Sequence, residues 1–324
     1  TPLYSSAASD VYKRQILGCG LIGISWTALF LHHGINVHAW DPNAAARNAL
    51  SEKVKAPMSQ LSDIGPPAVT LGSLSVFTEM SAALDGVMFV QESAPEVIDL
   101  KHEIYDNFEH SADSDALIAS SASGLSWSSL SAKMSAPERL LTAHPFNPPH
   151  LVPLVEMYSP LDVVLDRAER IYCQIGRVPV RMKREATGHI ANRLASALWR
   201  EAVNIVVEGI ADVEAVDLAL VNGPGLRWAV AGAHMTYHLG GGEGGMAQYL
   251  RHLGPSQESR WEDLGSPTLT PEVCAKLISG VEAEAKGKSI KELEKARDAG
   301  LMRLLAARDL SLIHISEPTR RRGI

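Results

Sequence analysis

The stretch Ile16-Leu17-Gly18-Cys19-Gly20-Leu21-Ile22-Gly23 decides the fold of this chain, because it sets three glycines between two apolar patterns. Residues 24–33 continue it with a helical pattern, and residues 35–40 have the pattern of a short strand that closes on Asp41. A strand end, a glycine turn, a helix and a second strand that ends in an acid form the βαβ unit that binds dinucleotides. The alternative is a glycine-rich turn that only closes a strand–helix corner.

The three glycines have separate expected tasks in this unit. Gly18 makes the tight turn, Gly20 lets the backbone approach a pyrophosphate, and Gly23 lets the helix pack on the strand. The phosphates then lie at the helix N-terminus, where unpaired N–H groups and the helix dipole stabilise negative charge.

Asp41 is expected to select the cofactor. Its carboxylate can accept hydrogen bonds from a ribose 2′-hydroxyl and repels a 2′-phosphate. No arginine occurs in residues 42–44, so the sequence favours NAD over NADP. The alternative role of Asp41, a surface cap for the next helix, is compatible with this one.

The composition is that of a globular protein with room for two domains. The chain has 324 residues, of which 46% are hydrophobic and 21% are charged, and its formal net charge is −7. Such a chain lacks the basic face that nucleic acids and anionic membranes require. Three cysteines without paired spacing exclude a disulfide framework or a zinc ribbon, and we expect no metal site. No apolar run approaches the roughly 18 residues of a membrane span and no secretion signal is visible, so we expect a cytoplasmic protein.

The two ends, residues 1–15 and 311–324, resemble translated sequencing-adapter readthrough and have no period that serves a fold. We expect both to be non-native tails. Lys13, Arg14 and Gln15 would then occupy places in a central parallel strand that ought to be apolar on both faces, which weakens the strand.

Apolar strand patterns alternate with helical patterns up to about residue 183, which predicts an α/β fold with a doubly wound, Rossmann-type parallel sheet. We expect this NAD-binding domain over residues 16–183. Pro57 is expected to break the helix predicted over residues 44–61. The further strands are expected at residues 74–77, 86–92, 116–121, 140–144, 153–157 and 177–181, and the further helices at residues 80–84, 94–110 and 163–175.

Beyond residue 183 no strand pattern recurs, so residues 184–310 are expected to form an all-helical second domain. Apolar residues recur on one face of a long helix over residues 188–208. The glycine-rich run at residues 240–245 predicts a loop with positive φ values. Further helices are expected at residues 212–221, 246–253, 271–286 and 289–307.

His144 lies in the densest polar constellation of the chain, at the end of a predicted parallel strand. Ligands and catalysts collect beyond the carboxyl ends of such strands. A dehydrogenase that moves a hydride from a secondary alcohol to nicotinamide needs a base for the hydroxyl proton, and histidine suits that task. Glu156, on the neighbouring strand, could hold the imidazole tautomer and stabilise its cation. The alternative for His144 is a satisfied core or surface histidine.

Several motifs together resemble the L-3-hydroxyacyl-CoA dehydrogenase family from Ile16 to about Arg308. They are the glycines at residues 18–23, the serine-rich run at residues 120–125, the run His144-Pro145-Phe146-Asn147-Pro148, Glu156, and the run Gly188-His189-Ile190-Ala191-Asn192-Arg193-Leu194.

This resemblance implies that His144 is the general base and that Glu156 forms a dyad with it. It also implies that Ser123 and Asn192 hold the substrate oxygens. The second domain would then serve substrate binding and dimerisation, so we expect a homodimer with the substrate between the domains. The implied NAD contacts are Gly18, Gly20, the backbones of Leu21 and Ile22, Gly23, Asp41, Glu96, Lys101 and Asn147.

Each of these residues also has a structural explanation. A single serine in the run at residues 120–131 is more often a turn or helix cap than a ligand. Asn192 lies in an apolar-faced helix, where asparagine usually points to solvent. A glutamate that opens a helix, such as Glu96, complements the helix dipole. Only the joint match of these positions favours functional roles.

Residues 223–229 and 238–246 resemble the branch of this family that contains L-carnitine dehydrogenase and L-gulonate 3-dehydrogenase (lambda-crystallin), which act on free 3-hydroxy acids. Arg227 could pair a substrate carboxylate, and Trp228 could face a quaternary ammonium group. The alternative is a structural arginine and a core tryptophan. We therefore expect an NAD-dependent oxidoreductase for a small, carnitine-like 3-hydroxy acid. A sugar acid ranks second and an acyl-CoA thioester third, and the non-enzyme alternative is an NAD-binding structural protein.

Overall fold

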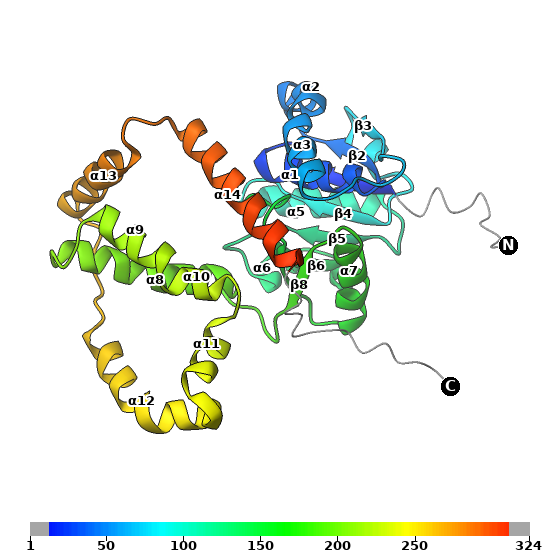
Figure 1. Ribbon diagram of the computed structural model, residues 1–324. Helices are drawn as coiled ribbons and strands as arrows, with labels where there is room; N and C mark the ends of the chain where they lie inside the picture. The colour runs from blue at the N-terminus through cyan, green and yellow to red at the C-terminus, as the bar shows by residue number, and fades with distance from the viewer. Residues whose placement is uncertain (1–12, 311–324) are drawn as a thin grey trace. The chain divides into compact units, whose positions relative to one another are not determined.

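The computed structural model describes residues 13–310, which divide into two compact units. The sheet unit comprises the described residues up to Ala191 together with Gly300–Ala306, and the helical unit comprises mainly Asn192–Ala299. Figure 1 shows a sheet flanked by helices in the first and helices alone in the second. Of the expected tails, residues 1–12 and 311–324 lie outside the described residues.

Eight strands form one sheet in the order β3-β2-β1-β4-β5-β6-β7-β8. The prediction of a doubly wound sheet followed by a helical part is confirmed, with one departure from parallel pairing, between β6 and β7. The strands are β1 (Lys13–Leu17), β2 (Asn36–Trp40), β3 (Leu74–Val76), β4 (Phe89–Glu92), β5 (Leu117–Ser120), β6 (Leu140–Pro145), β7 (Leu154–Tyr158) and β8 (Val178–Arg181).

The antiparallel pair of β6 and β7 follows from the length of its connection. Only residues 146–153 join the two strands, and so short a segment has no room for the crossover helix that a parallel pair needs. In the resulting register His144 lies opposite Glu156.

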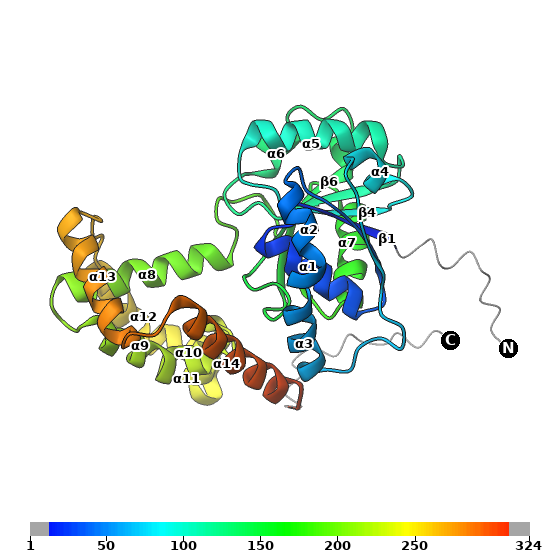
Figure 2. The same cartoon turned by 90° about the horizontal axis from the view of Figure 1, so that it is seen from above.

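Helices cover both faces of the sheet, and each face has its own apolar core (Figure 2). Because successive strand residues point to opposite faces, Ile16 packs in one core and Leu17 in the other. The first core includes residues of α1 (Leu21–His32), α3 (Lys55–Ile64) and α7 (Asp162–Gln174), and the second includes residues of α4 (Met80–Leu84), α5 (Ile98–Ser111) and α6 (Trp127–Ser131).

The helix predicted over residues 44–61 is broken as expected, but at Val54 rather than at Pro57 itself. The chain passes from α2 (Ala44–Lys53) to α3 at Val54, and Pro57 lies in the first turn of α3. Proline is tolerated there, because the N–H groups of a first turn have no helical partner in any case.

Strand β1 contains the polar residues that we expected to weaken it. Gln15 has no exposed surface, and neither polar atom of its side chain has a hydrogen-bond partner within the described residues. A buried amide in this state costs roughly 1–3 kcal/mol of stability.

The helical unit contains no strand between Asn192 and Ala299. Helix α8 begins at Ala191 rather than at residue 188, because Gly188 and His189 have φ values of 76° and 50°, which a right-handed helix cannot include. The expected glycine loop is confirmed at Gly242 and Gly245, whose φ values are 58° and 56°. The helices are α8 (Ala191–Val207), α9 (Val213–Asn222), α10 (Pro224–Trp228), α11 (Ala233–Gly240), α12 (Gly245–Asp263), α13 (Pro271–Ala285) and α14 (Ile290–Leu310).

Two of these helices, α10 and α11, were not expected from the sequence. Gly225 lies inside α10 and Gly232 precedes α11, and glycines lower the helix propensity of this segment. Pro224 at the first position of α10 is the start signal that the sequence does contain. Across residues 13–310, no helix is both long and apolar enough to cross a membrane.

Candidate functional site

The glycine turn between β1 and α1 is tightly packed at two glycines and open at the third. A β-carbon on Gly18, whose φ is 95°, would lie 2.7 Å from the carbonyl oxygen of Ser93. A β-carbon on Gly23 would lie 1.8 Å from the carbonyl oxygen of Gly18. Gly20 has nothing within 4 Å of the same position, and as the N-cap of α1 it gives the helix no side-chain cap. A phosphate therefore has both space and N–H donors beside Gly20.

Asp41 follows β2 and is hydrogen-bonded to this turn. Its Oδ2 accepts from the N–H of Cys19 at 2.7 Å, and its Oδ1 accepts from the N–H of Asn43 at 2.8 Å. Asn43 is the cap of α2, so Asp41 does not have that role. Arg47, which we did not expect here, donates to the carbonyl oxygen of Asp41 at 2.6 Å. Arg47 lies in the first turn of α2, three residues beyond the segment 42–44 whose lack of arginine favoured NAD over NADP.

His144 and Glu156 form a buried pair. His144 Nδ1 lies 3.0 Å from Glu156 Oε2, and the two residues are 6% and 1% exposed. The other carboxylate oxygen accepts the backbone N–H groups of Ile190 and Ala191 at 2.7 and 2.8 Å. The left-handed turn at residues 188–189 makes this possible, because it aims two successive N–H groups at one oxygen.

The charge of Glu156 follows from these contacts. Burial alone would raise the pKa of the carboxyl, but the hydrogen bonds from His144, Ala191 and Ile190 outweigh burial and hold the pKa below its usual value. The ionised carboxylate is an acceptor only, so the His144 proton belongs on Nδ1, and Nε2 is the basic ring nitrogen.

His189 stacks on His144. The two ring centroids are 4.7 Å apart with an interplanar angle of 19°, and His189 is 3% exposed. His189 lies in the same run as Asn192, but the family resemblance implies a role only for Asn192. The feature that marks His189 is its left-handed backbone conformation shortly before α8 begins at Ala191.

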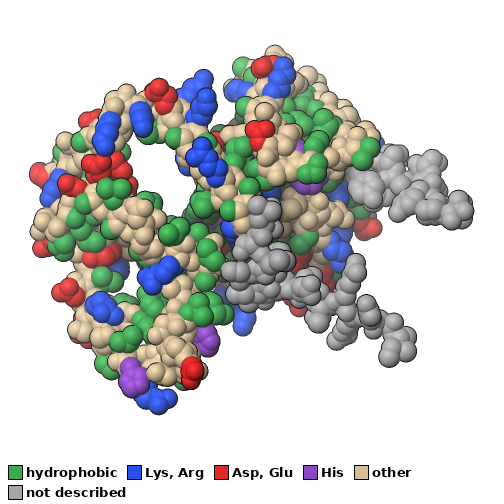
Figure 3. Space-filling model, in the orientation of Figure 1, with side chains coloured by type: hydrophobic (Ala, Val, Ile, Leu, Met, Phe, Trp, Pro, Cys, Tyr) green, Lys and Arg blue, Asp and Glu red, His purple; other side chains and the backbone are tan. Residues whose placement is uncertain are grey.

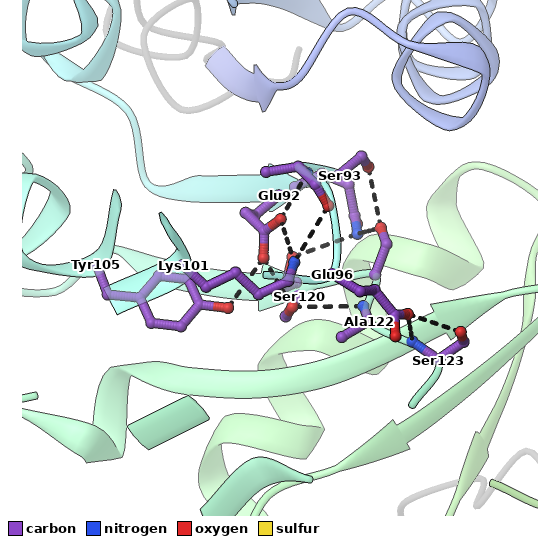
Figure 4. Close-up of polar contacts among 12 residues, drawn as sticks. Glu92, Ser93, Glu96, Lys101, Tyr105, Ser120, Ala122 and Ser123 are labelled. Carbon is purple, nitrogen blue, oxygen red and sulfur yellow. Dashed lines mark hydrogen bonds and ion pairs between the residues drawn. The ribbon is translucent and has the colours of Figure 1, made fainter. Parts of the chain in front are cut away.

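Ser123 lies on the other side of His189 and is held by Glu96. The Ser123 hydroxyl donates to Glu96 Oε1 at 2.6 Å, the Ser123 N–H also donates to Oε1, and the Gly124 N–H donates to Oε2 at 3.0 Å. Figure 4 shows Glu96 turned toward Ser123. The backbone of Ser123 also hydrogen-bonds to His189. The structure therefore brings Ser123, Glu96, His144 and Glu156 into one site around His189.

Glu96 is ionised for the same reason as Glu156. Burial raises the pKa of its carboxyl, while the hydrogen bonds from Ser123 and Gly124 lower it by more. As long as the Ser123 hydroxyl hydrogen points to Glu96, the lone pairs of the hydroxyl oxygen are what it can offer to a ligand.

Lys101, expected as a cofactor contact, has no exposed surface. Its Nζ lies 2.6 Å from Glu92 Oε1 and donates to the carbonyl oxygen of Ala94 at 3.3 Å. Tyr105 and Ser120 donate to the other Glu92 oxygen at 2.9 and 2.7 Å (Figure 4). This cluster joins β4, β5 and α5 beneath the segment that carries Glu96. A direct NAD contact would require the pair to open, so that role of Lys101 stays a prediction.

Four other expected site residues lie at or beside element ends. Asn147 is exposed in the turn after β6, Leu21 is 63% exposed at the start of α1, and Ile22 beside it is half-buried. Asn192 is the second residue of α8 and is partly buried.

Arg227 and Trp228 end α10 but do not share one surface. Arg227 lines an open groove of about 520 Å³ within the helical unit, together with Leu226, Thr236 and Gly240. Trp228 is not one of the lining residues, and with 37% of its surface exposed it is not a core tryptophan either.

Comparison with known families gives two matches that together cover most of the chain. Residues 13–186 match the 3-hydroxyacyl-CoA dehydrogenase NAD-binding domain, and residues 188–275 match the 3-hydroxyacyl-CoA dehydrogenase C-terminal domain. The family resemblance and the choice of NAD as cofactor are confirmed.

Similar proteins match over nearly the whole chain. The L-carnitine dehydrogenase of Nocardiopsis dassonvillei is 40% identical over 95% of this chain and 94% of its own. That of Streptomyces griseus is 39% identical over 94% and 92%. Among solved structures, 5-formyl-3-hydroxy-2-methylpyridine 4-carboxylic acid 5-dehydrogenase, an NAD⁺-dependent dismutase, has a TM-score of 0.77 at 27% identity. The match covers 93% of this chain and 98% of the chain of that structure.

Proposed function

This chain belongs to the 3-hydroxyacyl-CoA dehydrogenase family, and we propose that it oxidises the 3-hydroxyl group of a small, free L-3-hydroxy acid of the carnitine type. As a member it is an NAD-dependent dehydrogenase that acts on a CH–OH group. The observation that carries the proposed chemistry is the buried His144–Glu156 pair at the end of β6. The substrate class is supported by relatives named L-carnitine dehydrogenase at 39% and 40% identity.

His144 is the proposed general base. With its proton on Nδ1 facing Glu156, Nε2 accepts the proton of the substrate 3-hydroxyl as the hydride leaves C3 and the C–O bond becomes a carbonyl. Glu156 then faces an imidazolium ion and stabilises it. Because Glu156 is held by two backbone N–H groups as well, it has little freedom to turn away during this step.

The residues of the glycine turn fit NAD. Gly20 leaves room beside the uncapped start of α1, and Asp41 is fastened to the same turn through Cys19. These features suit a pyrophosphate and a ribose diol. Bound NAD supplies the hydride acceptor.

Ser123 and Asn192 are the proposed partners of the substrate oxygens. The Ser123 hydroxyl donates to Glu96 in this structure, so it would turn from Glu96 to donate to the substrate 3-hydroxyl oxygen, while the single hydrogen of that hydroxyl goes to Nε2 of His144. Asn192, with both an amide donor and a carbonyl acceptor, suits the product carbonyl as well as the substrate hydroxyl. The matched NAD-binding domain that ends at residue 186 supports the expected division at residues 183 and 184.

Arg227 is the proposed partner of the substrate carboxylate. It lines a groove whose other sides include Leu226 and Thr236, and a guanidinium binds a carboxylate in two parallel hydrogen bonds. The net charge of −7 suits a substrate that carries a quaternary ammonium group better than one that carries coenzyme A phosphates. Trp228 is a weaker candidate, because it lies outside the groove.

The proposed substrate is tested by comparing kcat/KM for L-carnitine, L-gulonate and 3-hydroxybutyryl-CoA. We expect L-carnitine to lead, and Arg227→Gln to lower its kcat/KM roughly 10- to 100-fold, as for the loss of a charge-assisted pair. The matched control is Arg251→Gln on α12 of the same unit, also exposed, which should change little. A clear preference for the thioester would overturn the ranking, and no turnover with NAD still bound would favour a binding protein.

We also propose that the protein is a homodimer and that the helical unit forms the interface. The support is its surface: Leu194, Trp199, Leu218 and Ile278 are each more than half exposed. Trp199 and Ile278 also line one apolar groove, and exposed apolar surface of this kind is typical of subunit interfaces.

A further inference from the structure

We propose that His189 is a positioning residue for His144, whose flat, uncharged ring supports the imidazolium ion that forms when His144 takes the substrate proton. The inference rests on the proposed function in one respect, namely that His144 is the base.

The geometry of the pair is that of a ring support. The two imidazoles are nearly parallel, with an angle of 19° and 4.7 Å between centroids. Parallel stacking at this distance leaves no hydrogen bond between the rings, so His189 acts on His144 through its face. His189 is itself 3% exposed and is held from behind by the backbone of Ser123.

The charges around the pair decide which ring takes a proton. From β7, Glu156 lies within hydrogen-bond distance of His144, whereas the buried Nδ1 of His189 has no hydrogen-bond partner among the described residues. Glu96, before α5, is the other carboxylate that acts on His189. Burial first, and the neighbouring charge of His144 second, lower the pKa of His189 below its usual value, against weaker opposing effects of Glu156 and Glu96. The contact with the Glu156 carboxylate favours a proton on His144 over one on His189.

A neutral aromatic face beside a flat cation is attractive when both are shielded from water. The attraction is stronger for the cation than for the neutral His144 ring, so it favours proton acceptance in the transition state. An interaction of this kind changes an equilibrium roughly 3- to 30-fold.

The backbone at His189 makes a crossed experiment possible. With φ at 50°, this position tolerates asparagine well and phenylalanine poorly. His189→Phe therefore keeps the flat face but adds backbone strain, whereas His189→Asn removes the face without that strain. A structural role and a ring-support role predict opposite outcomes for the two variants.

The test measures kcat/KM against pH, together with an NMR titration of the His144 ring in the protein without substrate. If the face matters, His189→Phe keeps the wild-type pH profile and stays within roughly 3-fold in rate. His189→Asn should lose roughly 3- to 30-fold and move the His144 titration midpoint to lower pH. An impaired Phe variant with an unimpaired Asn variant, or an unchanged midpoint in the Asn variant, overturns the proposal.

The titration separates this proposal from the proposed function. It needs no turnover, so a wild type that oxidises no 3-hydroxy acid refutes the function while the midpoint shift still tests His189. Conversely, an unmoved midpoint refutes the role of His189 even where His144→Ala abolishes oxidation of L-carnitine.

Discussion

The sheet unit and the helical unit differ in how they bury apolar side chains. The sheet unit has a core on each face, and its largest members, Trp26, Tyr105 and Tyr172, have no exposed surface. Between Asn192 and Ala299, the buried apolar side chains are Val203, Val206, Val213 and Tyr249. Figure 3 shows hydrophobic side chains open to solvent on this unit. Because apolar burial is the main force in folding, the sheet unit stabilises itself, whereas the helical unit requires a further surface.

The same division separates chemistry from recognition. The hydrogen bonds that join His144 to Glu156, Glu156 to Ile190 and Ser123 to Glu96 lie within the sheet unit, where neighbouring strands and loops restrain them. The groove at Arg227 lies in the helical unit. Under the proposed function, the base would lie in the rigidly held unit and the substrate groove in the more loosely packed one, so a change of substrate would not require rebuilding the base.

The largest expected effect tests whether the sheet unit houses the chemistry. His144→Ala should lower turnover roughly 10²- to 10⁴-fold, as for the loss of a general base, with NAD affinity nearly unchanged. The measurement is NADH formation together with NAD binding by calorimetry, and the control is His110→Gln, an exposed histidine on α5. Turnover retained in His144→Ala would place the base elsewhere.

The second test asks whether a partner chain covers the helical unit. Ile278, 58% exposed, lines an apolar groove of about 480 Å³ with Trp199 and Val281. Ile278→Asp should dissociate the dimer by light scattering at micromolar concentration, because a charge replaces apolar contact worth roughly 1.5–3 kcal/mol.

Its matched control is Val69→Asp in the sheet unit, where the side chain is fully exposed. That variant should keep both its mass and its stability. A wild type that is monomeric at this concentration and as stable as the sheet unit would remove the contrast between the units.

The third test concerns cofactor choice in the sheet unit. Asp41→Ala should weaken NAD roughly 10-fold through loss of a charged hydrogen bond, and it should allow NADP because Arg47 is already within reach of that site. The double variant Asp41→Ala/Arg47→Gln should lose the NADP gain. If wild type uses NADP as well as NAD, Asp41 does not select the cofactor.

The smallest expected effect concerns a flaw in the better-packed unit. Gln15→Val should raise the free energy of unfolding by roughly 1–3 kcal/mol, since it removes an unsatisfied amide from β1. Gln91→Val is the matched contrast, because Gln91 is equally buried but hydrogen-bonds to Tyr172 and Ser121. In urea unfolding, the free energy of unfolding should therefore rise for Gln15→Val and fall for Gln91→Val. A lower free energy of unfolding for Gln15→Val would show that the buried amide does not destabilise the protein.

The sequence predicts best where one local rule suffices. The glycine turn and the alternating strands follow from short-range chemistry, and the structure has both of them. Two features depend on other segments: β7 pairs antiparallel with β6, and α5 begins at Ile98 rather than at residue 94 as expected. Glu96 is hydrogen-bonded to Ser123 and Gly124, which keeps it out of the helix that its sequence would open.

The site shows the same limit. His144 could be predicted because it lies at the end of a strand, and Glu156 because it lies on the neighbouring strand; the antiparallel register sets them opposite each other. The stacking of His189 and the burial of Lys101 could not, because each depends on where a second element packs. Arg47 could have been found from the sequence by searching the whole first turn of α2.

One carboxylate also sets a rule for building hybrid enzymes from this scaffold. Glu156 on β7 accepts hydrogen bonds from the backbone N–H groups of Ile190 and Ala191. These two peptides therefore help to orient the proposed base, His144, although they lie at the start of the following helix. A graft that replaces the substrate-selecting part should therefore join after Ala191. A junction at residue 184 would replace the peptides that orient the proposed base. An inactive hybrid would then result from the position of the junction and not from an incompatible substrate pocket.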